Sequence, residues 1–166
     1  MEKADILKGK RVLVVDDEKD VLNTVKDILY MCELDLASSF EEAKERLESR
    51  HYDLVVLDIM GVDGYRLLEI SKRKNIPAAM FTAHAFSADN LKRSINEGAC
   101  AYIPKEEMSS LPDFLSDIFK AIEERKDPWE SWRERLPSSY FETRWGAAWK
   151  DQDRDFWERF WSSRKK

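Results

Sequence analysis

The chain has 166 residues, of which 43% are hydrophobic and 37% charged, and 33 acidic against 28 basic side chains give a formal net charge of −5. This length suits one domain, or one domain with a small extension, and the acidic balance excludes nucleic-acid binding through a broadly basic surface. No apolar run approaches the roughly 20 residues of a membrane-spanning helix, and Met1–Asp5 lacks the apolar core of a secretion signal. We therefore expect a soluble, cytoplasmic protein that binds neither DNA nor membranes.

Residues up to about 126 alternate short apolar runs with helical patterns. The runs are continuous and rich in β-branched residues, which is typical of parallel strands buried on both faces. Between and after them, apolar residues recur every three or four positions, as on one face of a helix. Ser39, with Glu42 three residues later, predicts the start of the second helix. The expected strands are 11–15, 34–37, 52–57, 76–81 and 101–103, and the helical patterns fall at 21–29, 40–47, 65–70, 91–95 and 111–122.

This alternation predicts an α/β fold: a flavodoxin-like, doubly wound, five-stranded parallel sheet with strand order 2-1-3-4-5 and a short helical C-terminal extension. The composition changes at Asp127 and Pro128, because all six tryptophans follow them while aliphatic residues nearly vanish. We therefore divide the chain into a domain, 1–126, and an aromatic-rich helical tail, 127–166.

Polar side chains stand at the ends of four predicted strands. Asp16 and Asp17 follow the first strand and Asp58 the third, while Thr82 follows the fourth and Lys105 the fifth. All should converge on the carboxyl edge of the sheet, where open α/β folds build their sites. Adjacent carboxylates repel each other unless a cation neutralises them, and Mg²⁺ prefers a few carboxylates together with a phosphate oxygen.

The same set suits phosphoryl transfer to a carboxylate, which needs an ionised nucleophile, a metal and fixed donors for the phosphoryl oxygens. Each residue alone also has an ordinary structural explanation. Asp17 could cap a helix starting near Glu18, and an Asp after a strand commonly begins a turn. The combination, in order and at matching strand ends, favours the chemical interpretation.

Four segments resemble the signature blocks of response-regulator receiver domains of two-component signalling. They are VLVVDDE at 12–18, VVLDIM at 55–60, FTA at 81–83 and GACAYIPK at 98–105, and the resemblance covers about residues 9–126. It implies a phosphoacceptor signalling protein rather than an enzyme, with self-phosphorylation and slow autodephosphorylation only.

By this resemblance, Asp58 accepts a phosphoryl group from a sensor histidine kinase, a phosphotransfer protein or a small phosphodonor. Asp16, Asp17 and Asp58 hold Mg²⁺ together with the backbone carbonyl of Met60. The output is a switched protein-interaction surface. Receivers usually continue into an output domain, often a DNA-binding one, but the tail at 127–166 is too short for most of these and shows no helix-turn-helix pattern, so we expect no DNA-binding output domain.

Lys105 and Thr82 then bind phosphoryl oxygens, and Tyr102 turns inward as Thr82 moves. Family members signal outward through the surface formed by the fourth helix, fifth strand and fifth helix. One departure lies in the loop from Asp58 to Gly64, which is shorter than usual and lacks a proline. A shorter loop beside the metal is expected to alter ion affinity or the lifetime of the phosphoryl group.

The tail shows aromatic residues at helical spacing, and Pro128 and Pro137 punctuate it into two or three short helices. Its positive and negative charges nearly balance despite the basic end at 164–166, which argues against binding to a membrane surface. One interpretation is a small satellite that packs on the domain. The other is an interaction surface for an unknown downstream protein or a second copy in a homodimer, because tryptophan is enriched in binding hot spots.

Two other functions remain open. A phosphorylation-independent, receiver-like scaffold could bind a partner or dimerise through the tail. A hydrolase of the aspartyl-phosphate kind also places an Asp after a strand, but it needs an Asp-x-Asp spacing where this chain has adjacent Asp16 and Asp17.

Overall fold

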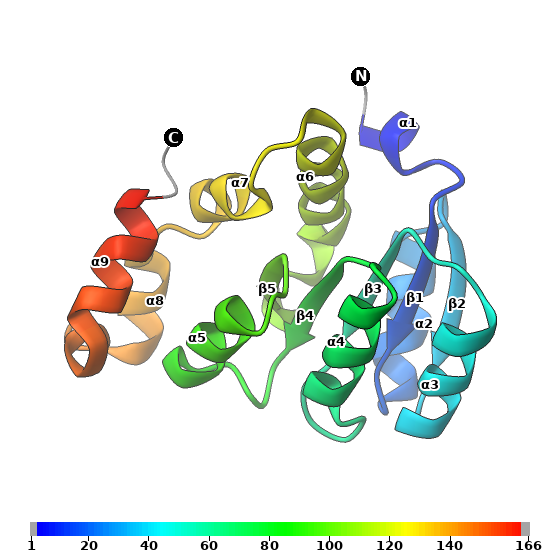
Figure 1. Cartoon of the computed structure of the whole chain (residues 1–166), viewed down its shortest axis with the longest axis horizontal. Helices are drawn as coiled ribbons and strands as arrows, with labels where there is room; N and C mark the ends of the chain where they lie inside the picture. The colour runs from blue at the N-terminus through cyan, green and yellow to red at the C-terminus, as the bar shows by residue number, and fades with distance from the viewer. Residues whose placement is uncertain (1–2, 164–166) are drawn as a thin grey trace.

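Five short apolar runs form one parallel sheet with the order β2-β1-β3-β4-β5, as predicted (Figure 1). The strands are β1 (Arg11–Val15), β2 (Glu33–Ala37), β3 (Leu54–Leu57), β4 (Ala78–Thr82) and β5 (Ala101–Pro104). All residues of β3, β4 and β5 are buried, which explains their continuous apolar sequences. The computed structural model describes residues 3–163. Two short segments lie outside the described residues. They are 1–2, the start of the segment that lacks a secretion signal, and 164–166, the basic end of the tail.

Helices cover both faces of the sheet. They are α1 (Lys3–Leu7), α2 (Lys19–Ile28), α3 (Phe40–Ser49), α4 (Gly64–Arg73), α5 (Ala88–Asn96) and α6 (Leu111–Glu124). Right-handed crossovers put α3, α4 and α5 on one face and α2 on the other, and Figure 1 shows α3 and α4 in front of the sheet with α2 behind it. The predicted cap of α3 is confirmed: the Ser39 side chain accepts a hydrogen bond from the Glu42 N–H, and the Glu42 carboxylate accepts one from the Ser38 N–H.

The element boundaries differ from the prediction in places with a physical cause. β4 begins at Ala78 rather than at residue 76, because Pro77 has no N–H to donate to the ladder. A 3₁₀ segment, η1 (Lys105–Ser110), separates β5 from α6. The short helix α1 was not predicted, because five residues are too few to show a helical period. It packs on α6, and its Leu7 is fully buried.

Within residues 127–163 the tail forms three α-helices, α7 (Pro128–Arg135), α8 (Ser138–Trp145) and α9 (Arg154–Ser163), with a 3₁₀ turn η2 (Asp151–Asp153) before the last. Pro128 occupies the first position of α7, and the Asp127 side chain caps this helix by accepting a hydrogen bond from the Trp129 N–H. Four tail tryptophans are buried and continuous with the core of the domain: Trp129, Trp132, Trp149 and Trp157. The tail therefore packs on the domain, the first of the two interpretations.

None of the helices within residues 3–163 combines the length and apolar character that a membrane span requires.

Candidate functional site

Carboxylates from two strand ends meet at the carboxyl edge of the sheet. Asp16 follows β1 and Asp58 follows β3, and their residues are only 1% and 5% exposed. Asp17 and Glu18 are exposed beside them. Each of these four residues offers a carboxylate oxygen, and the four oxygens lie within 4.8 Å of one another. The parallel register explains the meeting, because Val15 of β1 pairs with Leu57 of β3, directly before the two aspartates.

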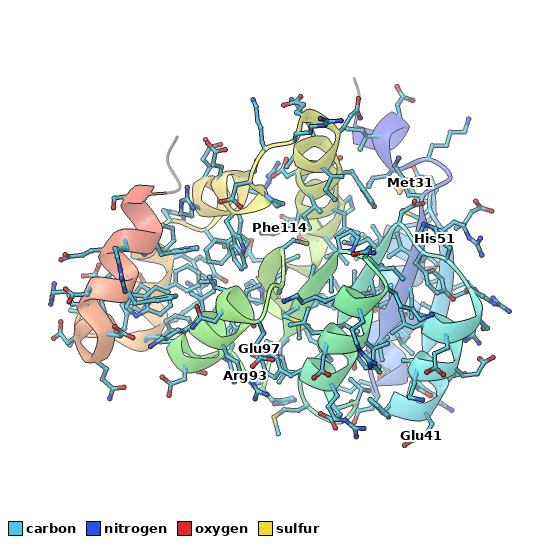
Figure 2. All side chains as sticks on the ribbon, viewed as in Figure 1. Met31, Glu41, His51, Arg93, Glu97 and Phe114 are labelled. Carbon is cyan, nitrogen blue, oxygen red and sulfur yellow. The ribbon has the colours of Figure 1, made fainter. Side chains whose placement is uncertain are left out.

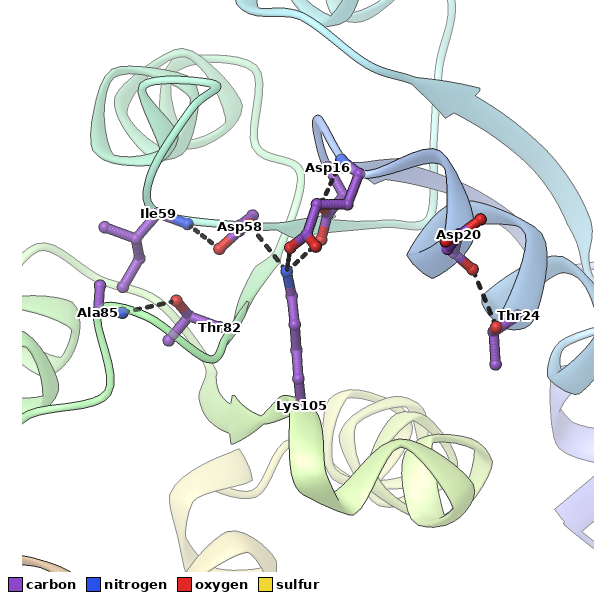
Figure 3. Close-up of polar contacts among 9 residues, drawn as sticks. Asp16, Asp20, Thr24, Asp58, Ile59, Thr82, Ala85 and Lys105 are labelled. Carbon is purple, nitrogen blue, oxygen red and sulfur yellow. Dashed lines mark hydrogen bonds and ion pairs between the residues drawn. The ribbon is translucent and has the colours of Figure 1, made fainter.

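Lys105 reaches into this acidic group from the end of β5. Its Nζ lies 2.6 Å from Oδ2 of Asp16 and 2.9 Å from Oδ2 of Asp58, and Figure 3 shows the side chain extended between the two carboxylates. A weaker contact of 3.4 Å joins it to Oε1 of Glu18. Burial by itself lowers the pKa of Lys105, but hydrogen bonds and charges from Asp16 and Asp58 outweigh it, and the net pKa is raised. Lys105 is therefore a fixed cation.

One ammonium does not neutralise the acidic group. Burial raises the pKa of Asp16 despite its contacts with Lys105 and the Glu18 N–H. Its Oδ2 is buried and, within residues 3–163, accepts no hydrogen bond of regular geometry, although it forms the ion pair with Lys105. Clustered carboxylate oxygens with incompletely satisfied lone pairs match the preference of a hard divalent cation such as Mg²⁺.

The short loop after Asp58 packs tightly against the acidic group because two of its residues are glycines. Gly61 has a φ of +83°, and a Cβ at this position would lie 2.2 Å from Oδ2 of Asp17. A Cβ at Gly64 would lie 2.0 Å from the backbone oxygen of Asp58. Met60, between Asp58 and Gly61, has a side chain 55% exposed, and the role of its carbonyl as a metal ligand stays a prediction.

The capping role considered for Asp17 is wrong. The turn before α2 is held by Asp16, whose Oδ1 accepts a hydrogen bond from the Glu18 N–H at 2.9 Å. Glu18 itself is the N-cap residue of α2 and makes no side-chain capping bond. The Asp17 carboxylate therefore has no capping task and lies over Gly61.

Thr82 and Tyr102 are linked through the loop between β4 and α5. Thr82 is fully buried, and its hydroxyl accepts a long hydrogen bond of 3.4 Å from the Ala85 N–H. Tyr102 is also fully buried. Its hydroxyl donates to the Ala85 carbonyl at 2.7 Å and accepts from the Ser87 N–H at 2.8 Å. The Tyr102 side chain thus points inward, beneath the loop that follows Thr82, and burial raises its pKa.

Phe86 and Glu106 join this region to the tail, and neither was predicted from the sequence. Phe86 lies in the loop after Thr82 and stacks on Tyr102, with ring centroids 5.3 Å apart. Glu106 directly follows Lys105, and its carboxylate accepts hydrogen bonds from Tyr140 and Arg144 of α8. The position of Glu106 beside Lys105 was an available signal, whereas nothing in the local sequence marks Phe86.

The imidazole of His51 takes no part in the site. Figure 2 shows His51 near Met31, at the amino-terminal edge of the sheet. The acidic group lies at the opposite, carboxyl edge. His84 is two residues past Thr82, with an exposed side chain.

The domain that carries this site is similar to known proteins. A family model described as the response regulator receiver domain matches residues 12–115. The chain is 34% identical over 103 residues to the two-component response regulator ARR18 of Arabidopsis thaliana, and the match covers 58% of this chain and 16% of that protein. It is 37% identical over 101 residues to the probable transcriptional regulator ycf27 of Cyanophora paradoxa, covering 58% of this chain and 42% of that one. The chain thus matches only a minor part of these relatives' length.

Solved structures show the same similarity. A CheY-like response regulator receiver domain protein from Methanospirillum hungatei JF-1 is 31% identical, with a TM-score of 0.56, and the match covers 71% of this chain and 94% of that one. The receiver domain of the Francisella response regulator 1452 is 26% identical, with a TM-score of 0.57, and the match covers 66% of this chain and 98% of that one.

Proposed function

The chain belongs to the response regulator receiver domain family, and we propose that Asp58 accepts a phosphoryl group from a sensor histidine kinase or a phosphotransfer protein. The observation that carries the proposal is the position of the Lys105 ammonium. Its Nζ bridges Asp16 and Asp58, so that a cation and two carboxylates from three different strands meet at one point. A single Asp at a strand end is ordinary. An ion pair buried beside further carboxylates costs desolvation energy, and such arrangements occur mainly at functional sites.

Neighbouring groups orient the Asp58 carboxylate as a nucleophile. Its Oδ1 accepts a hydrogen bond from the Ile59 N–H at 2.8 Å, and its Oδ2 lies 2.9 Å from Lys105 Nζ. In the proposed step, a carboxylate oxygen bonds to phosphorus while the phosphorus–nitrogen bond of the donor phosphohistidine breaks. The imidazole leaves with that electron pair and takes up a proton. Lys105 then pairs with one phosphoryl oxygen, and the Thr82 hydroxyl donates to another.

Asp16, Asp17 and Asp58, with the carbonyl of Met60, are the residues proposed to hold Mg²⁺. The ion would supply positive charge to the carboxylates and to the phosphoryl oxygens. The four carboxylates of the group and Lys105 sum to −3, four negative charges and one positive, before any phosphoryl group arrives. Further negative charge is therefore unfavourable without a cation.

We further propose that the protein is a cytoplasmic phosphoacceptor rather than an enzyme with turnover, with the receiver domain at 1–126 and the tail at 127–166. Its output would be contacts with a downstream protein, with a homodimer as one form, and not with DNA or membrane. The match covers 16% of the Arabidopsis relative's length.

The test is phosphorylation by acetyl phosphate in the presence of Mg²⁺, followed by intact-protein mass. The wild type should gain one phosphoryl group, and Asp58→Asn should gain none. Asp20→Asn is the matched control, because Asp20 lies on α2 outside the acidic group and the bond from Thr24 goes to its backbone oxygen rather than to its carboxylate (Figure 3). Equal labelling of the Asp58→Asn variant, or no labelling of the wild type, would refute the proposal.

A further inference from the structure

The tail covers the open edge of the sheet. β5 is an edge strand, and its outward carbonyls would be exposed to pairing with other chains. Instead, two indoles of α7 donate to backbone oxygens along this edge. Trp132 Nε1 donates to Tyr102 of β5 at 2.8 Å, and Trp129 Nε1 donates to Ala99, two residues before β5, at 3.1 Å. α7 therefore takes the place of a neighbouring strand.

The tail also continues an aromatic stack that begins inside the domain. Phe86 lies nearly parallel to Tyr102, at an interplanar angle of 11°. It also contacts two rings of α8, Phe141 at 5.9 Å and Trp145 at 5.0 Å between centroids. The Trp145 Nε1 donates to the Phe86 carbonyl at 3.2 Å. We call Phe86, Ala99, Tyr102 and Glu106 the docking face, because each bonds or stacks with a tail side chain.

Two short routes join the docking face to the acidic group. In the first, the Thr82 hydroxyl accepts from the Ala85 N–H, and the Ala85 carbonyl accepts from the Tyr102 hydroxyl. Phe86, the next residue after Ala85, then carries the stack into the tail. In the second, the backbone of Lys105 continues directly into Glu106, whose carboxylate is held by Arg144 and Tyr140.

We propose that docking of tail residues 128–162 on this face is coupled to phosphoryl binding at Asp58, and that each strengthens the other. The inference rests on the proposed function and adds the regulation of that site. The tail fixes the loop that directly follows Thr82 and the backbone next to Lys105, in an arrangement where Lys105 Nζ already lies 2.9 Å from Asp58. The two groups assigned to the phosphoryl oxygens are thus held in advance, which raises affinity for that ligand. Because linkage is reciprocal, an occupied site tightens the tail.

The distribution of tryptophan makes the coupling measurable in the whole chain. All six tryptophans lie in the tail, so tryptophan emission reports on the tail alone. Beryllofluoride with Mg²⁺ is the probe for the phosphoryl site, and its binding is followed independently by ¹⁹F NMR. We expect the probe to change tryptophan emission in the wild type and to leave it unchanged in Asp58→Asn.

The reciprocal arm uses tail variants. Arg144→Gln removes the contact with Glu106 at an exposed position, and Trp145→Leu removes the bond to Phe86. Arg154→Gln is the matched control, since Arg154 pairs with Asp151 inside the tail. The first two should bind beryllofluoride at least about fivefold more weakly than the wild type, at the low end of usual coupling strengths, and Arg154→Gln should match the wild type. The exposed Arg144→Gln keeps the test valid if Trp145→Leu does not fold.

The outcomes separate the two proposals. Beryllofluoride binding by the wild type without a change in emission, or with equal affinity in Arg144→Gln, overturns the coupling and leaves the proposed function intact. Tighter binding by the tail variants also overturns it. No binding by the wild type overturns both.

Discussion

The Nζ of Lys105 lies 2.9 Å from Oδ2 of Asp58, although the two residues are 47 positions apart in the chain. The pair closes the carboxyl edge of the sheet between the ends of β3 and β5, with β4 between them. Thr82, at the end of β4, lies at the same edge. A nucleophile, a cation and a hydroxyl are thereby held on rigid strand ends rather than on mobile loops, which suits a site that must bind one small anionic group.

Loss of the Lys105 charge should unbalance the acidic group. Lys105→Met keeps the aliphatic stem but leaves Asp16 and Asp58 without their shared cation. We expect a loss of roughly 1–3 kcal/mol of unfolding free energy, less than for a fully enclosed pair because the group borders on solvent. Mg²⁺ should bind the variant more tightly, since less positive charge opposes it. Urea unfolding with and without Mg²⁺ measures both effects, with Lys26→Met, at an exposed position of α2, as control. Unchanged stability and Mg²⁺ affinity would contradict the assigned role.

Substitution of Gly61 should damage the metal site beyond its cost to the backbone. Gly61→Ala requires a Cβ at a φ of +83° and 2.2 Å from Oδ2 of Asp17. Gly9→Ala is a matched control, because Gly9 has a φ of +75° and nothing within 4 Å of the added Cβ. The control should lose about 1–2 kcal/mol from the left-handed backbone alone. Gly61→Ala should lose more and also bind Mg²⁺ more weakly, as calorimetric titration would show. Equal Mg²⁺ affinity in both variants would count against Asp17 as a ligand.

The indole N–H of Trp132 should contribute to stability in a way that the Trp161 N–H does not. Trp132→Phe leaves the carbonyl of Tyr102 without its donor, at an expected cost of roughly 1–3 kcal/mol. Trp161 Nε1 is buried and has no hydrogen-bond partner within the described chain, so Trp161→Phe should be close to neutral or slightly stabilising. Thermal and urea unfolding of the two variants test the contrast. A smaller loss for Trp132→Phe than for Trp161→Phe would show that the edge of β5 does not depend on this bond.

Acid should weaken tail docking through Glu106. Hydrogen bonds from Arg144 and Tyr140 hold the pKa of Glu106 below its ordinary value of 4.5. A lowered folded-state pKa means that the contribution to stability is full above 4.5 and is lost as the pH falls through the lower folded value. Tryptophan emission of the tail, followed from neutral pH into this acidic range, should report the loss. Asp153, which pairs with Lys92, is present in both the wild type and Glu106→Gln. Subtracting the emission profile of the variant from that of the wild type therefore leaves the contribution of Glu106. Identical profiles for the wild type and Glu106→Gln would exclude the contribution.

The sequence predicted the sheet and the convergence of Asp16, Asp58 and Lys105, because both follow from local rules. Continuous apolar runs are typical of buried parallel strands, and parallel strands bring their carboxyl ends to one edge. The contact of Asp17 with Gly61 was not predictable in this way. It depends on the backbone path of a loop, and the sequence showed only that this loop is short.

The position of the tail was beyond prediction for a similar reason. Helical spacing predicted its short helices, but spacing along a helix does not say which surface the aromatic face will cover. The partners of Trp129 and Trp132 are backbone oxygens just before and within the edge strand β5, which carry no side-chain signature. Phe86 likewise has a role only because the fold stacks it between Tyr102 and α8.

The most direct test of the central claim locates the phosphoryl group itself. Protein treated with acetyl phosphate and Mg²⁺ is reduced with borohydride, which converts an aspartyl phosphate into homoserine, and its peptides are sequenced by mass spectrometry. The proposal predicts homoserine at Asp58 and at no other aspartate. Homoserine at Asp16 or Asp17, or none at any position, would contradict it.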